Sequence, residues 1–124
     1  MRWRDWLPFG KVPEISPEEV ARRCTTGPPL QILDVRTAAE FAKGHVAGAV
    51  HVPVHALSSS LPTLALDPHI EVVAVCKTAH RSIPAVRLLE GAGFAARQLE
   101  GGMDGWRRRG LPVTTDAAPD GDHS

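Results

Sequence analysis

Short apolar runs alternate with amphipathic stretches along most of the chain. Candidate strands occupy residues 30–35, 49–52, 72–75 and 95–99, with a possible edge strand at 12–15, and the valine-rich run over 72–75 is typical of a buried parallel strand. Stretches with helical signals occupy residues 16–24, 37–44, 54–66, 82–90 and 103–109. This repeated alternation predicts an α/β fold with a mainly parallel five-stranded sheet and helices on both faces.

Capping signals mark the beginnings of two of these helices. Ser16 precedes the first helix and Glu19 follows three residues later, which predicts a capping box. Thr37 and Glu40 repeat that spacing before the second helix. Pro62 is expected to interrupt or end the helix predicted over 54–66.

Length and composition predict one domain with two appendages. The 124 residues are 43% hydrophobic, which suits a single core over residues 12–113. Residues 1–11 carry Trp3 and Trp6 among basic residues, whereas residues 114–124 are small, polar and acidic and are expected to be disordered. The formal net charge is zero, so no overall field favours nucleic acid or a membrane as a partner.

Two cysteines, Cys24 and Cys76, do not form a disulfide framework in a chain of this size. The sequence opens on no secretory leader and contains no run long enough to span a membrane. A reducing cytoplasm is therefore the expected location, and a free reactive thiol is compatible with it.

Cys76 is the strongest candidate for chemistry. It ends the strand predicted over 72–75, and a short loop leads from it to the helix that begins at Ser82. Backbone N–H groups and the positive end of a helix dipole converge at such a position. Lys77, His80 and Arg81 add positive charge, so we expect the thiolate to be favoured over the thiol. Cys76 is therefore a candidate nucleophile, the alternative being a small buried core residue.

Four stretches in the right order give the chain a strong resemblance to the rhodanese-like superfamily, and in particular to single-domain rhodaneses of the thiosulfate sulfurtransferase type. The resemblance covers about residues 12–113 and implies the three-layer α/β fold of that superfamily. The stretches are Leu33–Arg36 with Glu40-Phe41, Gly44–Ala49 and Val52-Pro53; Cys76–Ser82; Leu99–Met103 with Gly105-Trp106; and Gly110–Val113.

The resemblance implies a persulfide mechanism without a metal or cofactor. Cys76 takes a sulfane sulfur from thiosulfate or another persulfide donor and passes it to cyanide or a thiol, including a thiol on a protein. Lys77 and Arg81 would attract the donor, while loop N–H groups and the Ser82 hydroxyl would hold the sulfur. Besides Cys76, the implied site residues are those of its loop: Lys77, Thr78, Ala79, His80, Arg81 and Ser82. Arg36 follows a predicted strand, at the side where open α/β sheets bind ligands, so it is a candidate donor-binding residue, the alternative being a scaffold pair with Asp34.

The loop departs from the family pattern at one position. Family loops commonly read Cys-x-x-Gly-x-Arg-Ser, and this chain has Ala79 where the glycine stands. If that position has a positive φ, alanine costs about 1 kcal/mol there and distorts the loop.

Three alternatives remain open. Phosphatases and arsenate reductases of the related Cys-x5-Arg type have one more residue between Cys and Arg than Cys76 and Arg81 have here. A sulfur carrier or persulfide-sensing module would use the same cysteine without turnover. His51 and His55 have a metal-ligand spacing, but Pro53 between them breaks the helix that would place both on one face.

Overall fold

The computed structural model describes residues 10–117. The predicted segment with Trp3 and Trp6 and most of the predicted acidic tail lie outside these residues.

Five strands form one parallel sheet in the order β1-β5-β4-β2-β3. This confirms the predicted mainly parallel five-stranded sheet. The strands are β1 (Glu14–Ile15), β2 (Gln31–Asp34), β3 (Val50–His51), β4 (Val72–Val75) and β5 (Ala96–Leu99).

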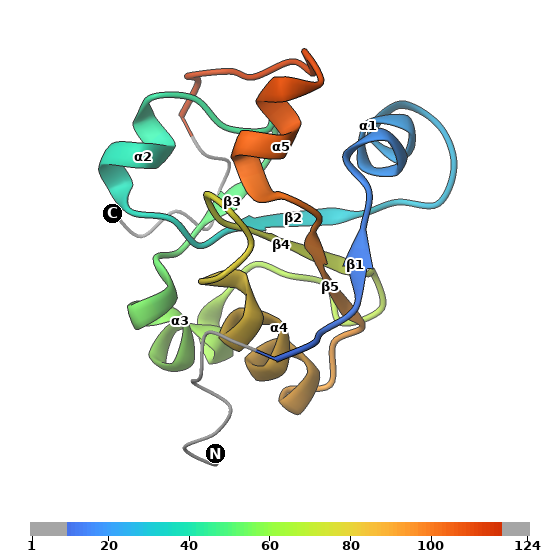
Figure 1. Ribbon diagram of the computed structural model, residues 1–124. Coiled ribbons are helices and arrows are strands. Elements are labelled where there is room, and N and C mark those ends of the chain that lie inside the picture. Colours follow the sequence, from blue (N-terminus) through green and yellow to red (C-terminus); the bar gives the residue numbers. More distant parts are fainter. Residues whose placement is uncertain (1–9, 118–124) are drawn as a thin grey trace.

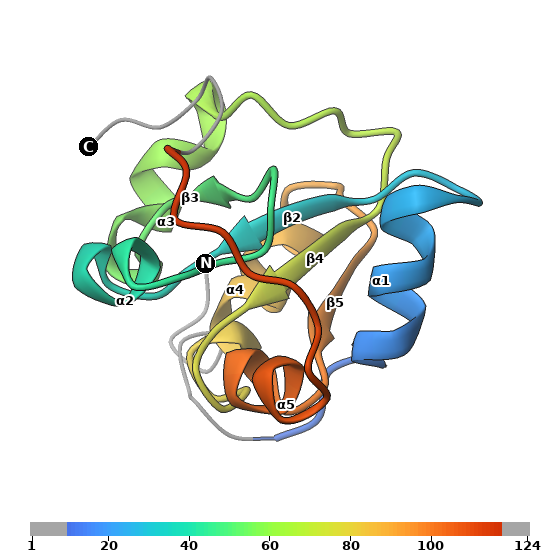
Figure 2. The same ribbon diagram turned by 90° about the horizontal axis from the view of Figure 1, so that it is seen from above.

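Helices cover both faces of the sheet, as predicted. Figure 1 shows α1, α2 and α5 on one face and α3 and α4 on the other, and Figure 2 views the sheet from the side of α1, α2 and α5. The helices are α1 (Pro17–Thr25), α2 (Ala38–Ala42), α3 (Val54–Ser60), the 3-10 helix η2 (Leu61–Thr63), α4 (Ser82–Gly91) and α5 (Gly102–Arg108).

The central strand β4 divides its side chains between two cores because successive strand residues point to opposite faces. Val72 and Ala74 pack in the core that includes Leu57 of α3 and Val86 of α4. Val73 and Val75 point to the opposite face and join the other core, which includes residues of α1, α2 and α5. All four strand residues are buried, which explains the continuous apolar run in the sequence.

The two predicted capping signals differ in outcome. Thr37 and Glu40 form a complete capping box, with hydrogen bonds in both directions. Ser16 Oγ accepts a hydrogen bond from Glu19 N, but the Glu19 carboxylate accepts from the Arg22 guanidinium instead of closing a box. Arg22 lies three residues away on the same helix, and its charged guanidinium is a stronger partner for that carboxylate than the backbone N–H of Ser16.

The helix predicted over 54–66 is interrupted near Pro62, as expected: α3 ends at Ser60, a single 3-10 turn contains Pro62, and residues 64–66 are not helical. One segment differs from the sequence-based expectation. Thr114, placed by the sequence in the acidic tail, exchanges two backbone hydrogen bonds with His45 at 2.8 and 2.9 Å.

Within residues 10–117, no helix is both long and apolar enough to cross a membrane.

Candidate active site

Cys76 lies at the carboxyl end of β4, on the face that packs against α4. It continues the alternation of Val72 and Ala74 and belongs to the same core. Its relative exposure is 1%. The position is next to the beginning of α4, as predicted from the sequence.

Backbone hydrogen bonds from α5 fix the beginning of the loop after Cys76. Met103 N and Asp104 N donate to the carbonyl oxygens of Cys76 and Lys77, at 2.8 and 3.0 Å. Gly102 allows this approach, since a Cβ at that residue would lie 2.5 Å from both carbonyl oxygens. The first turn of α5 therefore fixes the backbone that carries the nucleophile.

Two polar groups contact the Cys76 sulfur. The backbone N–H of His80 donates to Sγ at 3.1 Å, which closes the loop over the sulfur. Ser82 Oγ lies 3.3 Å from Sγ, and Ser82 is fully buried at the first position of α4. The loop thus brings together the predicted nucleophile, one inward-pointing N–H group and the predicted hydroxyl.

Ala79 has a φ of +71°, and it is the one non-glycine residue with positive φ among residues 10–117. This is the left-handed region, which disfavours any residue with a Cβ by about 1 kcal/mol or more. Thr78 Oγ1 and His80 Nδ1 lie 3.0 Å apart on either side of it. Residue 79 therefore has a conformation that a glycine, the common residue at this place in rhodanese-like loops, would adopt without strain.

The two cationic side chains of the loop are both ion-paired. Lys77 Nζ lies 2.9 Å from Asp104 Oδ2, with both side chains exposed to solvent. Arg81 donates two hydrogen bonds to the Glu40 carboxylate, at 2.6 and 2.9 Å. These partners reduce the net positive charge at the loop relative to the sequence-based expectation.

Strong electrostatic coupling links Arg81 to Glu40. The Arg81 hydrogen bonds are the main cause that lowers the pKa of Glu40 from its ordinary 4.5 to about 2, and the Thr37 hydrogen bonds act in the same direction. The same pair raises the pKa of Arg81, to which the nearby Cys76 sulfur adds a smaller electrostatic contribution. Arg81 is thus fixed as a permanent cation beside the sulfur.

Arg36, predicted as a possible donor-binding residue, is buried in the scaffold at the end of β2. Its guanidinium donates to both oxygens of Asp34, at 2.7 to 3.1 Å, and to Gly44 O at 2.9 Å. The relative exposure of Arg36 is 4%. Its backbone oxygen lies 2.8 Å from His51 Nε2, which gives that histidine a structural partner.

Two residues that the sequence did not single out extend the site. Gln98 on β5 accepts a hydrogen bond from Ser82 Oγ at 2.6 Å, and its Nε2 donates to Glu14 on β1 at 2.9 Å. Gln98 is buried and follows the core residue Ala96 by two positions, so it faces the same side of the sheet. An amide at a strand position two residues after a core residue, on the face that packs in the core, is the signal that could have identified it.

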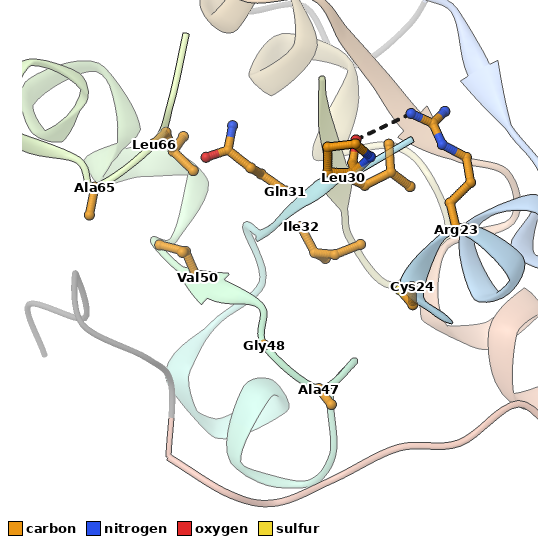
Figure 3. Close-up of a pocket in the computed structure, with 11 residues that line it drawn as sticks. Arg23, Cys24, Leu30, Gln31, Ile32, Ala47, Gly48, Val50, Ala65 and Leu66 are labelled. Carbon is orange, nitrogen blue, oxygen red and sulfur yellow. Dashed lines mark hydrogen bonds between the residues drawn. The ribbon is translucent and has the colours of Figure 1, made fainter. Parts of the chain in front are cut away.

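A pocket of about 440 Å³ lies near the amino-terminal edge of the sheet, opposite the edge that carries Cys76. Figure 3 shows it between the end of α1, the first residues of β2 and the loop before β3. Cys24 lines it and is exposed overall, but partial burial of the thiol raises its pKa. Cys24 is therefore a weak nucleophile at neutral pH.

The sequence of residues 16–109 matches the family model of the rhodanese-like domain. The chain belongs to the rhodanese-like domain family. This confirms the resemblance drawn from the sequence motifs.

This rhodanese-like chain is also similar to named proteins of other organisms. It is 32% identical over 111 residues to a sulfurtransferase of Allochromatium vinosum, covering 89% of this chain and 99% of that protein. It is 36% identical over 105 residues to an HTH-type transcriptional regulator of Mycobacterium tuberculosis, covering 83% of this chain and 45% of that protein. The chain thus spans nearly all of one relative and less than half of the other.

A solved structure shows the same fold. The rhodanese-related protein of Thermoplasma volcanium superposes with a TM-score of 0.76 and 24% identity, over 85% of this chain and all of that one. Together, the rhodanese-like domain and the relatives named as sulfurtransferases support sulfurtransferase activity in general.

Proposed function

We propose that the protein moves a sulfane sulfur from thiosulfate or a persulfide donor to cyanide or a thiol through a persulfide on Cys76. The observation that carries the proposal is the position of the Cys76 sulfur, which ends β4 and accepts a hydrogen bond from His80 N–H inside the loop. An N–H group that points inward stabilises negative charge on sulfur, both on a thiolate and on a persulfide.

The reaction consists of two nucleophilic displacements. The Cys76 thiolate attacks the outer sulfur of the donor, and the S–S bond of the donor breaks. The leaving group is sulfite when the donor is thiosulfate and a thiolate when the donor is a persulfide. The outer sulfur of the Cys76 persulfide is then attacked by cyanide or by an acceptor thiolate, which releases thiocyanate or a new persulfide and restores the thiolate. Electrons balance in each step, so no external oxidant or reductant is needed.

Arg81, Lys77 and Cys76 have proposed roles in this scheme. Arg81, held as a cation beside Glu40, and the exposed Lys77 supply the positive charge that attracts an anionic donor. Burial of Cys76 restricts access to donors whose transferable sulfur is terminal. Arg36 serves the scaffold, because its guanidinium is already bonded to Asp34 and Gly44 O.

The proposal is tested by thiocyanate formation from thiosulfate and cyanide. Cys76→Ser is expected to abolish it, whereas Cys24→Ser, on the opposite edge of the sheet, is expected to keep most of it. A comparable loss in both variants would indicate a two-cysteine redox mechanism. Hydrolysis of p-nitrophenyl phosphate with no activity on thiosulfate would instead indicate a phosphatase.

A second candidate function is a sulfur carrier or persulfide sensor that uses the same Cys76 persulfide. It is favoured by the similarity to part of a protein named as a transcriptional regulator. Formation of the persulfide in one turnover, with negligible transfer to cyanide or small thiols, would distinguish this function from an enzyme.

A further inference from the structure

A continuous row of hydrogen bonds leads from the nucleophile to the edge strand of the sheet. Cys76 Sγ lies 3.3 Å from Ser82 Oγ, and Ser82 Oγ donates to Gln98 Oε1 at 2.6 Å. Gln98 Nε2 donates to Glu14 Oε2 at 2.9 Å. Glu14 and Gln98 are adjacent because β1 and β5 pair in that register.

The chemistry of the groups fixes the direction of every hydrogen bond in this row. An ionised carboxylate accepts only, so Glu14 requires the NH₂ side of the Gln98 amide. The amide oxygen then faces Ser82 and also accepts only, so it takes the single hydroxyl hydrogen of Ser82. Ser82 therefore presents a lone pair to Cys76. In this orientation the Ser82 hydroxyl can accept a hydrogen bond from the Cys76 thiol but cannot donate one to the thiolate.

We propose that Glu14 is a positioning residue which, through Gln98, holds the Ser82 hydroxyl turned away from the Cys76 sulfur and so favours its thiol form. The effect on sulfur transfer rests on the proposed function, in which the Cys76 thiolate is the form that attacks the donor. For Ser82 to donate to the thiolate, its hydrogen must leave Gln98 Oε1, and that buried oxygen then loses its partner.

Replacing the Glu14 carboxylate by a neutral amide shifts the preference of Cys76 from the thiol towards the thiolate. A neutral amide at position 14 can accept from or donate to Gln98, so the Gln98 amide is free to turn and present its NH₂ group to Ser82. Ser82 then accepts from Gln98, and its hydrogen is available to the sulfur. A hydrogen bond to an ionised acceptor is stronger than one between neutral groups, so this change favours the thiolate.

Other charged and titratable groups lie on the loop or on the elements packed next to it, and a substitution at Glu14 leaves them unchanged. The loop contributes three of them, and α5, α2 and the end of β2 contribute the rest. They are Lys77, His80 and Arg81 on the loop, Asp104 on α5, Glu40 on α2, and the pair of Asp34, the last residue of β2, with Arg36.

The test measures the pH dependence of iodoacetamide alkylation in the Cys24→Ser background, where Cys76 is the single cysteine of the chain. Glu14→Gln is expected to move the midpoint of alkylation to lower pH and to raise the rate below that midpoint at least about threefold. Gln98→Met, which removes the acceptor that holds the Ser82 hydrogen, is expected to act in the same direction. The effects of the two substitutions are expected not to add, because both act through Ser82.

The matched control is Ser82→Ala, since loss of a carboxylate also acts on the sulfur through space. If the hydroxyl transmits the effect, Glu14→Gln is expected to leave the midpoint unchanged in the Ser82→Ala background. An equal shift with and without Ser82 would overturn the proposal in favour of a through-space charge effect, and so would no shift or a shift to higher pH. Alkylation needs no sulfur donor, so this result is independent of whether sulfur transfer itself is observed.

Discussion

Ala79 carries backbone strain at the centre of the active-site loop. Its φ of +71° lies in the region where the Cβ of an L-residue approaches the following carbonyl oxygen. The neighbouring His80 N–H must nevertheless point at the Cys76 sulfur. The loop therefore keeps the geometry of the proposed persulfide site in spite of the alanine, and relief of this strain is measurable.

Ala79→Gly is expected to stabilise the protein by up to about 1 kcal/mol, because relief of the left-handed conformation exceeds the added entropy of the unfolded chain. Urea unfolding measures the change, and sulfur transfer is expected to be kept or raised. Ala92→Gly is the matched control, since Ala92 has a φ of −92° and offers no strain to relieve. Equal destabilisation by both substitutions would contradict the strain at Ala79.

Glu40 makes the stability of the protein depend on pH in the acid range. Its folded pKa of about 2 lies below its ordinary 4.5, so its stabilisation is complete above about pH 4.5 and is lost as the pH falls towards 2. Glu40→Gln is expected to lower the free energy of unfolding by about 1–2 kcal/mol near neutral pH, a discounted value for a partly exposed pair.

The difference between parent and Glu40→Gln is expected to shrink when urea unfolding is repeated towards about pH 3. Glu18→Gln is the control, because Glu18 pairs with Arg109 at the exposed surface. Its effect is expected to stay within about 0.5 kcal/mol at any pH. A Glu40→Gln deficit that is independent of pH would show that the carboxylate charge is not what stabilises the loop.

At the scale of elements, the contact between α5 and the active-site loop joins the scaffold to the chemistry. The first N–H groups of α5 have no partner within their own helix, and here they bind the carbonyl oxygens of Cys76 and Lys77. The same backbone segment carries the nucleophile and the cation paired with Asp104. A shift of α5 therefore displaces the site directly.

Gly102→Ala is expected to lower the free energy of unfolding by about 2–4 kcal/mol and to reduce sulfur transfer, because its Cβ would overlap both loop carbonyls at a φ of +59°. Differential scanning calorimetry and the thiosulfate assay measure the two effects. Gly91→Ala is the matched control, since a Cβ there meets no atom within 4 Å. It is expected to be neutral or slightly stabilising, and a similar loss in both variants would contradict the proposed close approach.

At the scale of the whole molecule, the sheet order explains what the sequence could and could not predict. The loop from Cys76 to Ser82 was found because its residues are contiguous and follow a recognisable strand. Gln98 and Glu14 were missed because they reach the site only through the β1-β5-β4 order. A single sequence does not specify which strands become neighbours.

The ion pairs illustrate the same division between local and distant information. The Thr37–Glu40 capping box was predicted because its residues lie three apart. The bond between Glu40 and Arg81 joins residues 41 positions apart, and the Lys77–Asp104 pair spans 27. Their neutralising effect on the loop therefore depends on the tertiary fold.

Mass spectrometry of the intact protein and its peptides after treatment with thiosulfate tests the central claim most directly. The account predicts an adduct of one sulfur atom on the peptide that contains Cys76, removed by cyanide with release of thiocyanate. The peptide that contains Cys24 is predicted to remain unmodified, since burial raises the pKa of that thiol. No adduct with thiosulfate or with an organic persulfide, or an adduct on Cys24 alone, would contradict sulfur transfer through Cys76.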